Sequence, residues 1–496
     1  MKEKYRNCIH GDTANIPYGD KSIEKFAFMR DTSWFGELCY GDKEIDNLKS
    51  VIIPETVIEI EAHAFSNCTG LKYVSLPRSL TTIGPSAFWC CTSLEHIIIP
   101  ENVSIIHDTS FAGCSSIDSI EVSPNNLHFS SQDNCLLTKD KTELILGCKN
   151  SIIPKSVKII RDNAFYGCTG LQHIDLPNKI ITLGKYCFSG CTALDNIEIP
   201  ISTNKISRGT FEHCKNLSHI EIPSCVSAIE EEAFLGCESL KEVRVSEHNP
   251  TYTSVNNCIL SKNGKVLIAG FNVSIIPVGV SVIEAAAFKG LRSLNHVDIP
   301  NTVEVIKESA FESSGLQGIV LPNSVTQIGA SAFDCCKELT SVKLSTVITV
   351  ISTACFRNCS SLIEINLPLS IKVIEPLAFM GCENLPYFYI HEGVTMIGYE
   401  AFSGCKQIRV IEIPNSLKST KTKNGWERCM SDALHRCSAL EIVRIKNTNP
   451  EEVEFLPWAI EYDHRSQVTI EVPIGTGYAY RQNPSFKGFK NINAIL

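Results

Sequence analysis

A phenylalanine recurs every 23 residues through most of this 496-residue chain. From Phe65 onward the steps are 23 residues, apart from one of 22 and two of 54. Each step of 54 is an ordinary step lengthened by 31 residues, and the two lengthened regions lie 123 residues apart. A short repeat of this kind indicates stacked coils that contact their neighbours, rather than several independent globular domains. The repeated residues are Phe65, Phe88, Phe111, Phe165, Phe188, Phe211, Phe234, Phe288, Phe311, Phe333, Phe356, Phe379 and Phe402.

The repeating unit reads L-x-x-I-x-I-P-x-x-V-x-x-I-x-x-x-A-F-x-x-C, as in the copy from Leu94 to Cys114. The alternation in L-x-x-I-x-I is typical of a short strand with one buried face, and the proline ends the strand because it has no N–H to donate. The apolar spacing in A-F-x-x-C-x-x-L predicts one or two turns of helix on the opposite side. One unit is too small to bury its own apolar face, so the units must stack into a solenoid.

This unit resembles the BspA-type leucine-rich repeat, also called the Treponema-type, over roughly residues 16–473. The resemblance implies an α/β repeat fold, a right-handed and curved leucine-rich-repeat solenoid. Its parallel sheet would lie on one side and short helical turns on the other, with two hairpin inserts. It also implies that many relatives lie on the bacterial surface and bind proteins of host or neighbouring cells.

The spacing of the repeats also predicts how the chain is organised. We expect an N-terminal repeat and cap at residues 1–47, a solenoid at 48–473 and a C-terminal cap at 474–496. The inserts lie near residues 123–150 and 246–273, and a degenerate unit spans 414–446. Asn263–Gly264 predicts a type I′ hairpin turn in the second insert. The inserts would serve either as lateral padding or as contact elements.

Twelve of the 23 cysteines stand at one position of the unit, where only Leu291 and Ser314 replace them between Phe65 and Leu434. Leucine at this position indicates an apolar site, because neither a metal nor a disulfide can use it. We therefore predict that these thiols are buried as small apolar groups. Disulfides between coils, and metal binding or catalysis, are the alternatives. Unpaired thiols would favour a reducing or anaerobic setting. The twelve are Cys68, Cys91, Cys114, Cys168, Cys191, Cys214, Cys237, Cys336, Cys359, Cys382, Cys405 and Cys437.

Several function classes find no support in the sequence. A net charge of −9 without a clustered basic face argues against nucleic-acid binding. No apolar run approaches the ~18 residues of a membrane span, and the N-terminus lacks the apolar core of a secretory signal. There is no P-loop, H-E-x-x-H, G-x-S-x-G or Rossmann motif. We therefore expect no catalytic activity, cofactor or metal. We also expect the protein to be a monomer.

In the expected strands, the third and fifth positions of L-x-x-I-x-I point away from the core, which predicts columns of polar side chains on the sheet. These columns have three interpretations: a solvated polar face, a protein-binding patch with pH-sensitive histidines, or a divalent-cation site. The first column holds His173, Asn196, His219 and Glu242, and the second holds Asp175, Glu198, Glu221 and Arg244.

A second candidate patch is aromatic. In LPYFYI, residues 385–390, the strand pattern places Phe388 inward and both Tyr387 and Tyr389 outward, with Val410 on the next coil. Exposed aromatic residues are frequent among those that dominate binding energy. Tyr73, with Ile52 and Ile98, forms a weaker patch of the same kind.

These features favour a non-catalytic scaffold that binds a protein partner and mediates adhesion or recognition. By resemblance it would lie on the bacterial surface or be secreted. If the chain is complete, the lack of a signal peptide instead predicts a cytoplasmic protein, and the alternative is an intracellular leucine-rich-repeat scaffold. A cation- or glycan-dependent binding module is the third hypothesis.

Overall fold

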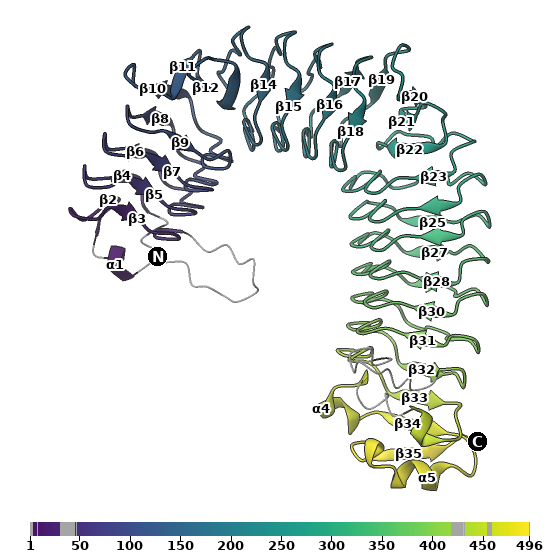
Figure 1. The fold of residues 1–496 in the computed structure, drawn as a ribbon. Helices are drawn as coiled ribbons and strands as arrows, with labels where there is room; N and C mark the ends of the chain where they lie inside the picture. Colours follow the sequence, from purple (N-terminus) through teal and green to yellow (C-terminus); the bar gives the residue numbers. More distant parts are fainter. Residues whose placement is uncertain are drawn as a thin grey trace. The chain divides into compact units, whose positions relative to one another are not determined.

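The structure, a computed structural model, describes residues 3–6, 8–29, 45, 47–417, 430, 432–453 and 459–495. Parts of the predicted N-terminal repeat and of the degenerate unit, residues 30–44 and 418–429, lie outside the described residues. The chain divides into two compact units, Met1–Thr253 and Ser254–Leu496. Each unit is a β-solenoid in which the strands of successive coils lie side by side (Figure 1).

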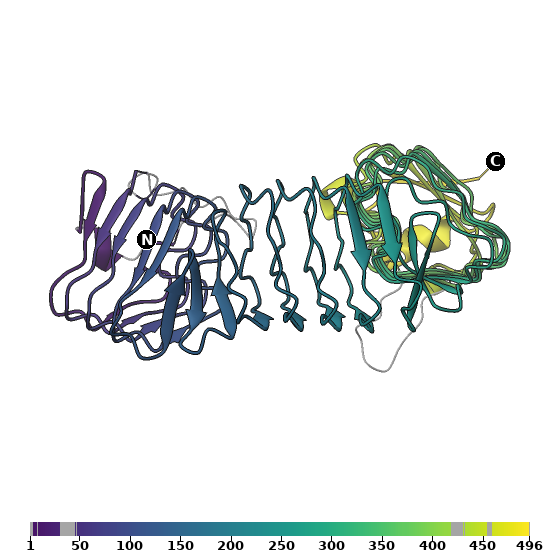
Figure 2. The same cartoon turned by 90° about the horizontal axis from the view of Figure 1, so that it is seen from above.

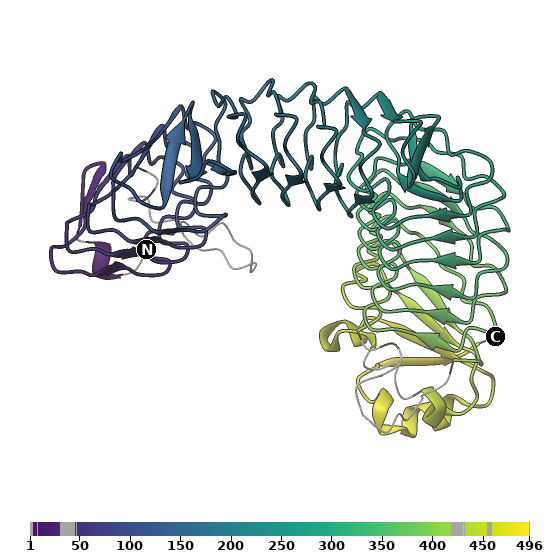
Figure 3. The same cartoon turned by 45° about the horizontal axis from the view of Figure 1, so that its top comes forward.

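The L-x-x-I-x-I segments form the face sheet, a name used here for these strands alone. In the first unit its strands pair in parallel and in register, with Ile52 beside Ser75 and Ile98 beside Glu121. Segments 171–177 and 194–200 form no strand, so the sheet consists of separate ladders (Figures 1 and 3). These are β2 (Thr13–Asn15), β4 (Ser50–Ile52) and β6 (Tyr73–Ser75); β8 (His96–Ile99) and β10 (Ser119–Val122); and β17 (His219–Ile222) and β19 (Glu242–Val245).

The face sheet of the second unit also consists of parallel ladders. Between its two ladders, a single parallel β-bridge joins Phe388 to Ile411. Short helices accompany its last coils. The ladders are β25 (Gly318–Val320), β27 (Ser341–Lys343) and β29 (Glu364–Ile365), and then β32 (Val410–Ile413), β33 (Ile442–Ile445), β34 (Thr469–Val472) and β35 (Asn491–Ala494). The helices are η1 (Pro450–Val453), α4 (Tyr462–Arg465), α5 (Gly477–Gln482) and η2 (Pro484–Phe486).

The V-x-x-I segments form a second set of parallel strands, each two residues long. Seen along its axis, each coil of the second unit closes around an interior that these strands help to enclose (Figure 2). In the first unit they are β3 (Ser22–Ile23), β5 (Glu59–Ile60), β7 (Thr82–Ile83), β9 (Ile105–Ile106), β14 (Ile159–Ile160), β15 (Thr182–Leu183), β16 (Lys205–Ile206) and β18 (Ala228–Ile229). In the second they are β23 (Val282–Ile283), β24 (Val305–Ile306), β26 (Gln327–Ile328), β28 (Val350–Ile351), β30 (Val373–Ile374) and β31 (Met396–Ile397).

The prediction of helical turns opposite the sheet is wrong. The A-F-x-x-C segment, called the arc below, instead alternates two kinds of backbone hydrogen bond. The N–H of Phe65 donates to the carbonyl of Ala87 on the next coil (2.8 Å), whereas the N–H of Cys68 donates to Phe65 of its own coil (3.2 Å). His63 and Asn67 have φ of 58° and 62°, which a right-handed helix does not allow. Within the described residues, helices occur only near the ends of the chain, where α1 (Glu3–Arg6) precedes the first strand, β1 (Ile9–His10).

The repeated phenylalanines lie inside the arcs and stack on one another. Their rings are 5.1–5.2 Å apart from Phe28 to Phe111, and 5.0–5.5 Å apart from Phe288 to Phe402. Such offset stacking adds to the free energy gained by burying each ring. The interior is therefore continuous from coil to coil along each of these two runs, as the repeat length implied.

The first insert joins the V-x-x-I strands rather than the face sheet. Its strands β11 (Phe129–Gln132), β12 (Cys135–Thr138) and β13 (Glu143–Leu146) pair antiparallel, and β13 then pairs in parallel with β14. Asn126, fully buried, fixes the start of the insert by donating to the carbonyls of Pro100 (2.7 Å) and Val103 (2.9 Å). Gly147 lies against the Phe165 ring, because a Cβ built on this residue would fall 2.1 Å from the nearest ring carbon. A glycine therefore lets the ring stack resume after the insert.

The second insert repeats this design, with Asn249 and Gly270 in the corresponding places. Its strands β21 (Cys258–Ser261) and β22 (Val266–Ala269) pair antiparallel, after β20 (Tyr252–Val255). The predicted type I′ turn is wrong, because Gly264 has a positive φ (70°) but Asn263 does not. The N–H of Gly264 donates to the carbonyl of Ser261 (2.8 Å), and the side chain of Asn263 accepts from the N–H of Lys265 (3.1 Å).

Candidate binding surfaces on the face sheet

The predicted polar columns lie on the exposed side of the first unit. His173, Asp175, Glu198, His219 and Glu221 are all exposed. The Nε2 of His173 lies 3.0 Å from the Oδ1 of Asp175, and both residues belong to the same coil. Within the described ranges, no three His, Cys, Asp or Glu residues are arranged to hold a metal ion.

Strand pairing determines which residues are neighbours in one part of these columns. His219 and Glu221 lie on β17, directly beside Glu242 and Arg244 on β19. His173 and Glu198 belong to the two segments without strand structure, 171–177 and 194–200. The second unit holds a further histidine–carboxylate pair, between His296 and Asp298 at 3.1 Å.

The aromatic patch is formed by Tyr387 and Tyr389, whose exposed fractions are 53% and 45%. Phe388 between them is buried and packs its ring 4.8 Å from Phe379 and 4.6 Å from Phe402. This packing holds the two tyrosines outward. The bridge from Phe388 to Ile411 places Val410 beside Tyr387.

Beyond Val410, the pairing of β32 with β33 extends the apolar column to Ile442. The neighbouring column carries charges that neutralise one another. Arg444 lies between Glu412 (2.8 Å) and Glu471 (2.7 Å). Burial alone would raise the pKa of Glu412, but hydrogen bonds from Arg444 and Lys446 hold that pKa below its ordinary value. The Nζ of Lys446 also lies 5.8 Å from the ring centroid of Tyr389, at cation–π distance.

The weaker patch of the first unit is exposed but less apolar. Ile52, Tyr73 and Ile98 are 51%, 51% and 61% exposed. The hydroxyl of Tyr73 donates to Glu95 (3.1 Å), and its ring lies 6.4 Å from that of His96. Polar partners therefore already engage this tyrosine within the unit.

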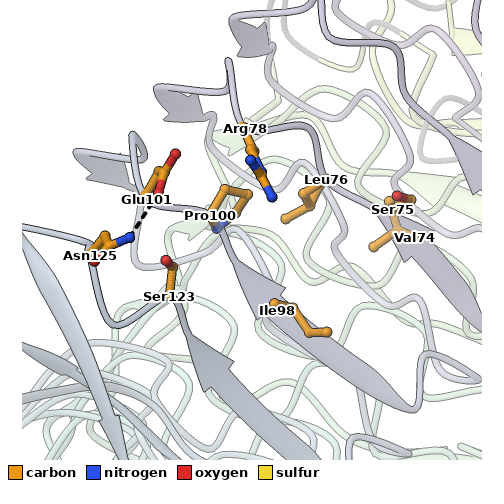
Figure 4. A pocket seen from close by; sticks show the side chains of 9 residues that line it. All are labelled: Val74, Ser75, Leu76, Arg78, Ile98, Pro100, Glu101, Ser123 and Asn125. Carbon is orange, nitrogen blue, oxygen red and sulfur yellow. Dashed lines mark hydrogen bonds between the residues drawn. The ribbon is translucent and has the colours of Figure 1, made fainter.

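Sequence reasoning missed two hollows in the face sheet. One, of about 420 Å³, lies at the ends of β6, β8 and β10, and Arg78, Glu101, Ser75, Ser123 and Ile98 line it (Figure 4). A signal was present in the sequence, since Ser123 stands where preceding copies of the unit have proline.

The other hollow, of about 630 Å³, lies in the second unit, and the residues that line it include His296, Gly318 and Glu364. It belongs to the coil that spans only 22 residues between phenylalanines. This shortened coil depends on Gly315, because a Cβ there would fall 1.9 Å from the carbonyl oxygen of Arg292. The step of 22 residues was the visible sign of this hollow.

The repeated cysteines are buried, as predicted, and all 21 described cysteines are free thiols. Except for Cys168, each of the twelve donates its S–H to the carbonyl of the phenylalanine on the preceding coil. Examples are Cys91 to Phe65 and Cys382 to Phe356, both at 3.1 Å. These bonds add a link between coils that the packing interpretation did not include. The donors are Cys68, Cys91, Cys114, Cys191, Cys214, Cys237, Cys336, Cys359, Cys382, Cys405 and Cys437.

The exceptions in this column follow from the inserts. Cys168 and Leu291 belong to the first regular coil after an insert, so the preceding coil offers no phenylalanine of the stack. Leucine is therefore tolerated where the S–H bond has no acceptor of this kind. Ser314 keeps a hydroxyl, which lies 3.3 Å from the Sγ of Cys336. Burial raises the pKa of Cys336 to about 12, so its thiol is neutral at ordinary pH.

No helix in the described part of the chain has the length and apolar character to cross a bilayer. The geometry is that of a leucine-rich-repeat solenoid with an exposed parallel sheet. The chain belongs to the family described as "BspA type Leucine rich repeat region", which matches residues 39–146, 145–263, 270–386 and 372–448. No curated protein matches the chain.

Solved structures similar to this chain include three leucine-rich-repeat proteins. A leucine-rich repeat protein of Eubacterium ventriosum is 20% identical, with a TM-score of 0.41, covering 77% of this chain and 88% of its own. One from Bacteroides ovatus is 20% identical, with a TM-score of 0.38, covering 93% and 91%. A leucine rich cell surface protein of Faecalibacterium prausnitzii is 24% identical, with a TM-score of 0.38, covering 89% and 92%.

Proposed function

We propose that this protein is a non-catalytic scaffold that binds a protein partner through the face sheet of its second unit. The single observation that carries the proposal is the pair of exposed tyrosines, Tyr387 and Tyr389, held outward by the buried Phe388. Rigid tyrosines lose little conformational entropy on binding and often dominate interface energies. Val410 and Ile442 extend the apolar contact area beside Tyr387.

The charges around this patch support a protein ligand. Arg444 forms ion pairs with both Glu412 and Glu471, so few of the neighbouring charges would be left unpaired by an approaching partner. A core of aromatic and aliphatic groups with a polar rim is the usual anatomy of a protein interface. We expect the protein to bind its partner as a monomer.

Partner capture tests this proposal. Immobilised wild-type protein is incubated with host-cell and bacterial extracts, and the same is done with the variant Tyr387→Ala/Tyr389→Ala. We expect the variant to lose at least ~10-fold of the captured partner, since hot-spot tyrosines contribute ~2 kcal/mol or more.

The matched control is Tyr462→Ala/Tyr478→Ala, which removes two tyrosines of the same unit that are 76% and 74% exposed. This control should capture the partner as the wild type does. Equal capture by the Tyr387/Tyr389 variant would disprove the proposed surface.

We further propose that the protein acts at the bacterial surface or is secreted, and that it mediates adhesion or recognition. The support is the family to which the repeat belongs. An intracellular scaffold is the second candidate, favoured by the free thiols, since oxidising compartments convert many thiols to disulfides. Protease treatment of intact source cells, with detection of the protein in their culture medium, distinguishes the two, because an intracellular protein is neither digested nor released.

A further inference from the structure

The hollow in the first unit is lined by one arginine, Arg78, and two serines, Ser75 and Ser123, whose side-chain polar groups make no hydrogen bond or ion pair within residues 47–417. Figure 4 shows the Arg78 side chain reaching between Leu76 and Pro100 toward the middle of the hollow. Within residues 47–417, no side chain forms an ion pair or hydrogen bond with its guanidinium. The hydroxyls of Ser75 and Ser123 likewise have no hydrogen-bond partner in this part of the chain.

The neighbouring carboxylate does not neutralise Arg78. Glu101 stands directly after Pro100, as Arg78 stands directly after Pro77, so the two residues occupy matching places on adjacent coils. Glu101 instead accepts a long hydrogen bond from Asn125, 3.4 Å between Nδ2 and Oε2. The hollow therefore presents one cation and one anion that are separate from each other.

The remaining lining of the hollow is apolar. Ile98 is 61% exposed, and Val74, Leu76 and Pro100 line the hollow beside it. Space for a ligand arises because Ser75 is small and lies in the same column as Ile52, and because Ser123 replaces a proline. A volume of about 420 Å³ is within the range of small-molecule sites.

We propose that this hollow binds a zwitterionic α-amino acid with an apolar side chain. Its carboxylate would accept hydrogen bonds from the guanidinium of Arg78, since arginine binds carboxylates in a two-pronged geometry. Its ammonium would donate to Glu101. Its side chain would cover Ile98 and Pro100 and remove their apolar surface from water.

Saturation-transfer NMR with L-leucine as the probe tests this site, because it detects weak binding and shows which ligand protons contact the protein. We expect the methyl signals of leucine to be saturated most strongly. N-acetyl-leucine lacks the ammonium, leucinamide lacks the carboxylate and glycine lacks the side chain. Each should bind ~10-fold more weakly, since a hydrogen bond to a charged group or a buried aliphatic side chain contributes roughly this factor.

Leucyl-leucine distinguishes a free amino acid from a short peptide as the ligand. In leucyl-leucine the carboxylate and the ammonium are farther apart, so it should bind more weakly than leucine. Equal or tighter binding of the dipeptide would overturn the assignment to a single amino acid, and equal binding of N-acetyl-leucine would overturn the role of Glu101.

Two variants test the residues. Arg78→Gln and Glu101→Gln should each weaken leucine binding ~10-fold or more. Both side chains lie at the surface, so the thermal unfolding midpoint should not change. The matched control is Arg244→Gln, which removes an exposed arginine of the same unit that does not line the hollow. No saturation transfer to leucine with the wild type, or equal transfer with Arg78→Gln, would overturn the proposal.

Discussion

In each coil the arc and the face sheet are built from neighbouring segments, yet the arc repeats its side chains from coil to coil whereas the face does not. The arc stacks phenylalanine on phenylalanine, with ring centroids 5.0–6.0 Å apart within each unit. The face places Ser75 beside Ile52, and Glu121 beside Ile98.

The difference follows from what each side contacts. An arc side chain lies between those of two other coils, so its size and shape must match both neighbours. A face side chain contacts solvent, so it can vary without breaking the stack. Repeated positions therefore report stability in this molecule, and the positions that depart from the repeat report candidate binding sites such as the hollow at Arg78.

The largest expected effect is that of alkaline pH, which should lower the free energy of unfolding through the buried thiols of the arcs and not through the face sheet. Burial raises the pKa of Cys168, Cys237, Cys336 and Cys437 to about 12. Above pH ~9 the unfolded chain releases thiol protons that the folded chain retains, so the free energy of unfolding falls as pH rises. Each such thiol should contribute about 1.4 kcal/mol per pH unit between pH ~9 and ~12.

Urea unfolding at pH 8 and pH 10 measures this effect. A double variant, Cys336→Ala/Cys437→Ala, provides the control, because its stability should depend less steeply on pH than that of the wild type. If the wild type has the same unfolding midpoint at both pH values, the thiols do not titrate as their burial implies.

Next in size is the removal of one ring from the arc. Phe333→Ala should lower the free energy of unfolding of its unit by ~3–5 kcal/mol, because it leaves a cavity between Phe311 and Phe356. Tyr387→Ala, on the face, should change that free energy by less than ~0.5 kcal/mol. Urea unfolding followed by circular dichroism compares the two, and similar losses would contradict the division between arc and face.

The smallest expected effect compares two cysteines of the arc, one with an S–H bond to the preceding coil and one without it. Cys382→Ala removes both apolar volume and the S–H bond to Phe356 (3.1 Å), whereas Cys168→Ala removes volume alone from the coil after the insert. The first should therefore cost ~0.5–1.5 kcal/mol more than the second, the usual net contribution of one hydrogen bond. Equal losses in urea unfolding would mean that the S–H bonds add nothing to packing.

Much of the fold could be predicted because the repeat carries it. The apolar positions of L-x-x-I-x-I predicted the inward faces of β8 and β17, which alternate exposed and buried residues. The outward direction of Tyr387 and Tyr389 followed from the same alternation. The prediction of helix failed because apolar spacing reports which residues are inside and not where their N–H groups donate. In the arc, alternate N–H groups donate to the next coil, as Phe65 does to Ala87.

The candidate site was only partly predictable. Single columns, such as the one from Tyr387 to Ile442, follow from the repeat once the register of the strands is assumed. The hollow at Arg78 combines side chains from three coils, and its chemistry depends on Arg78 not pairing with Glu101. Side-chain rotamers decide that outcome, and no pattern in the sequence encodes it.

By itself the sequence determined the coil length, the family and the identity of the buried residues, because a solenoid repeats one set of local contacts and the repeat is written in the chain. Only the tertiary structure decided that the arcs are turns rather than helices, and where the face sheet is hollowed. Both depend on contacts between coils, which form among residues distant in the chain and follow from packing rather than from local spacing.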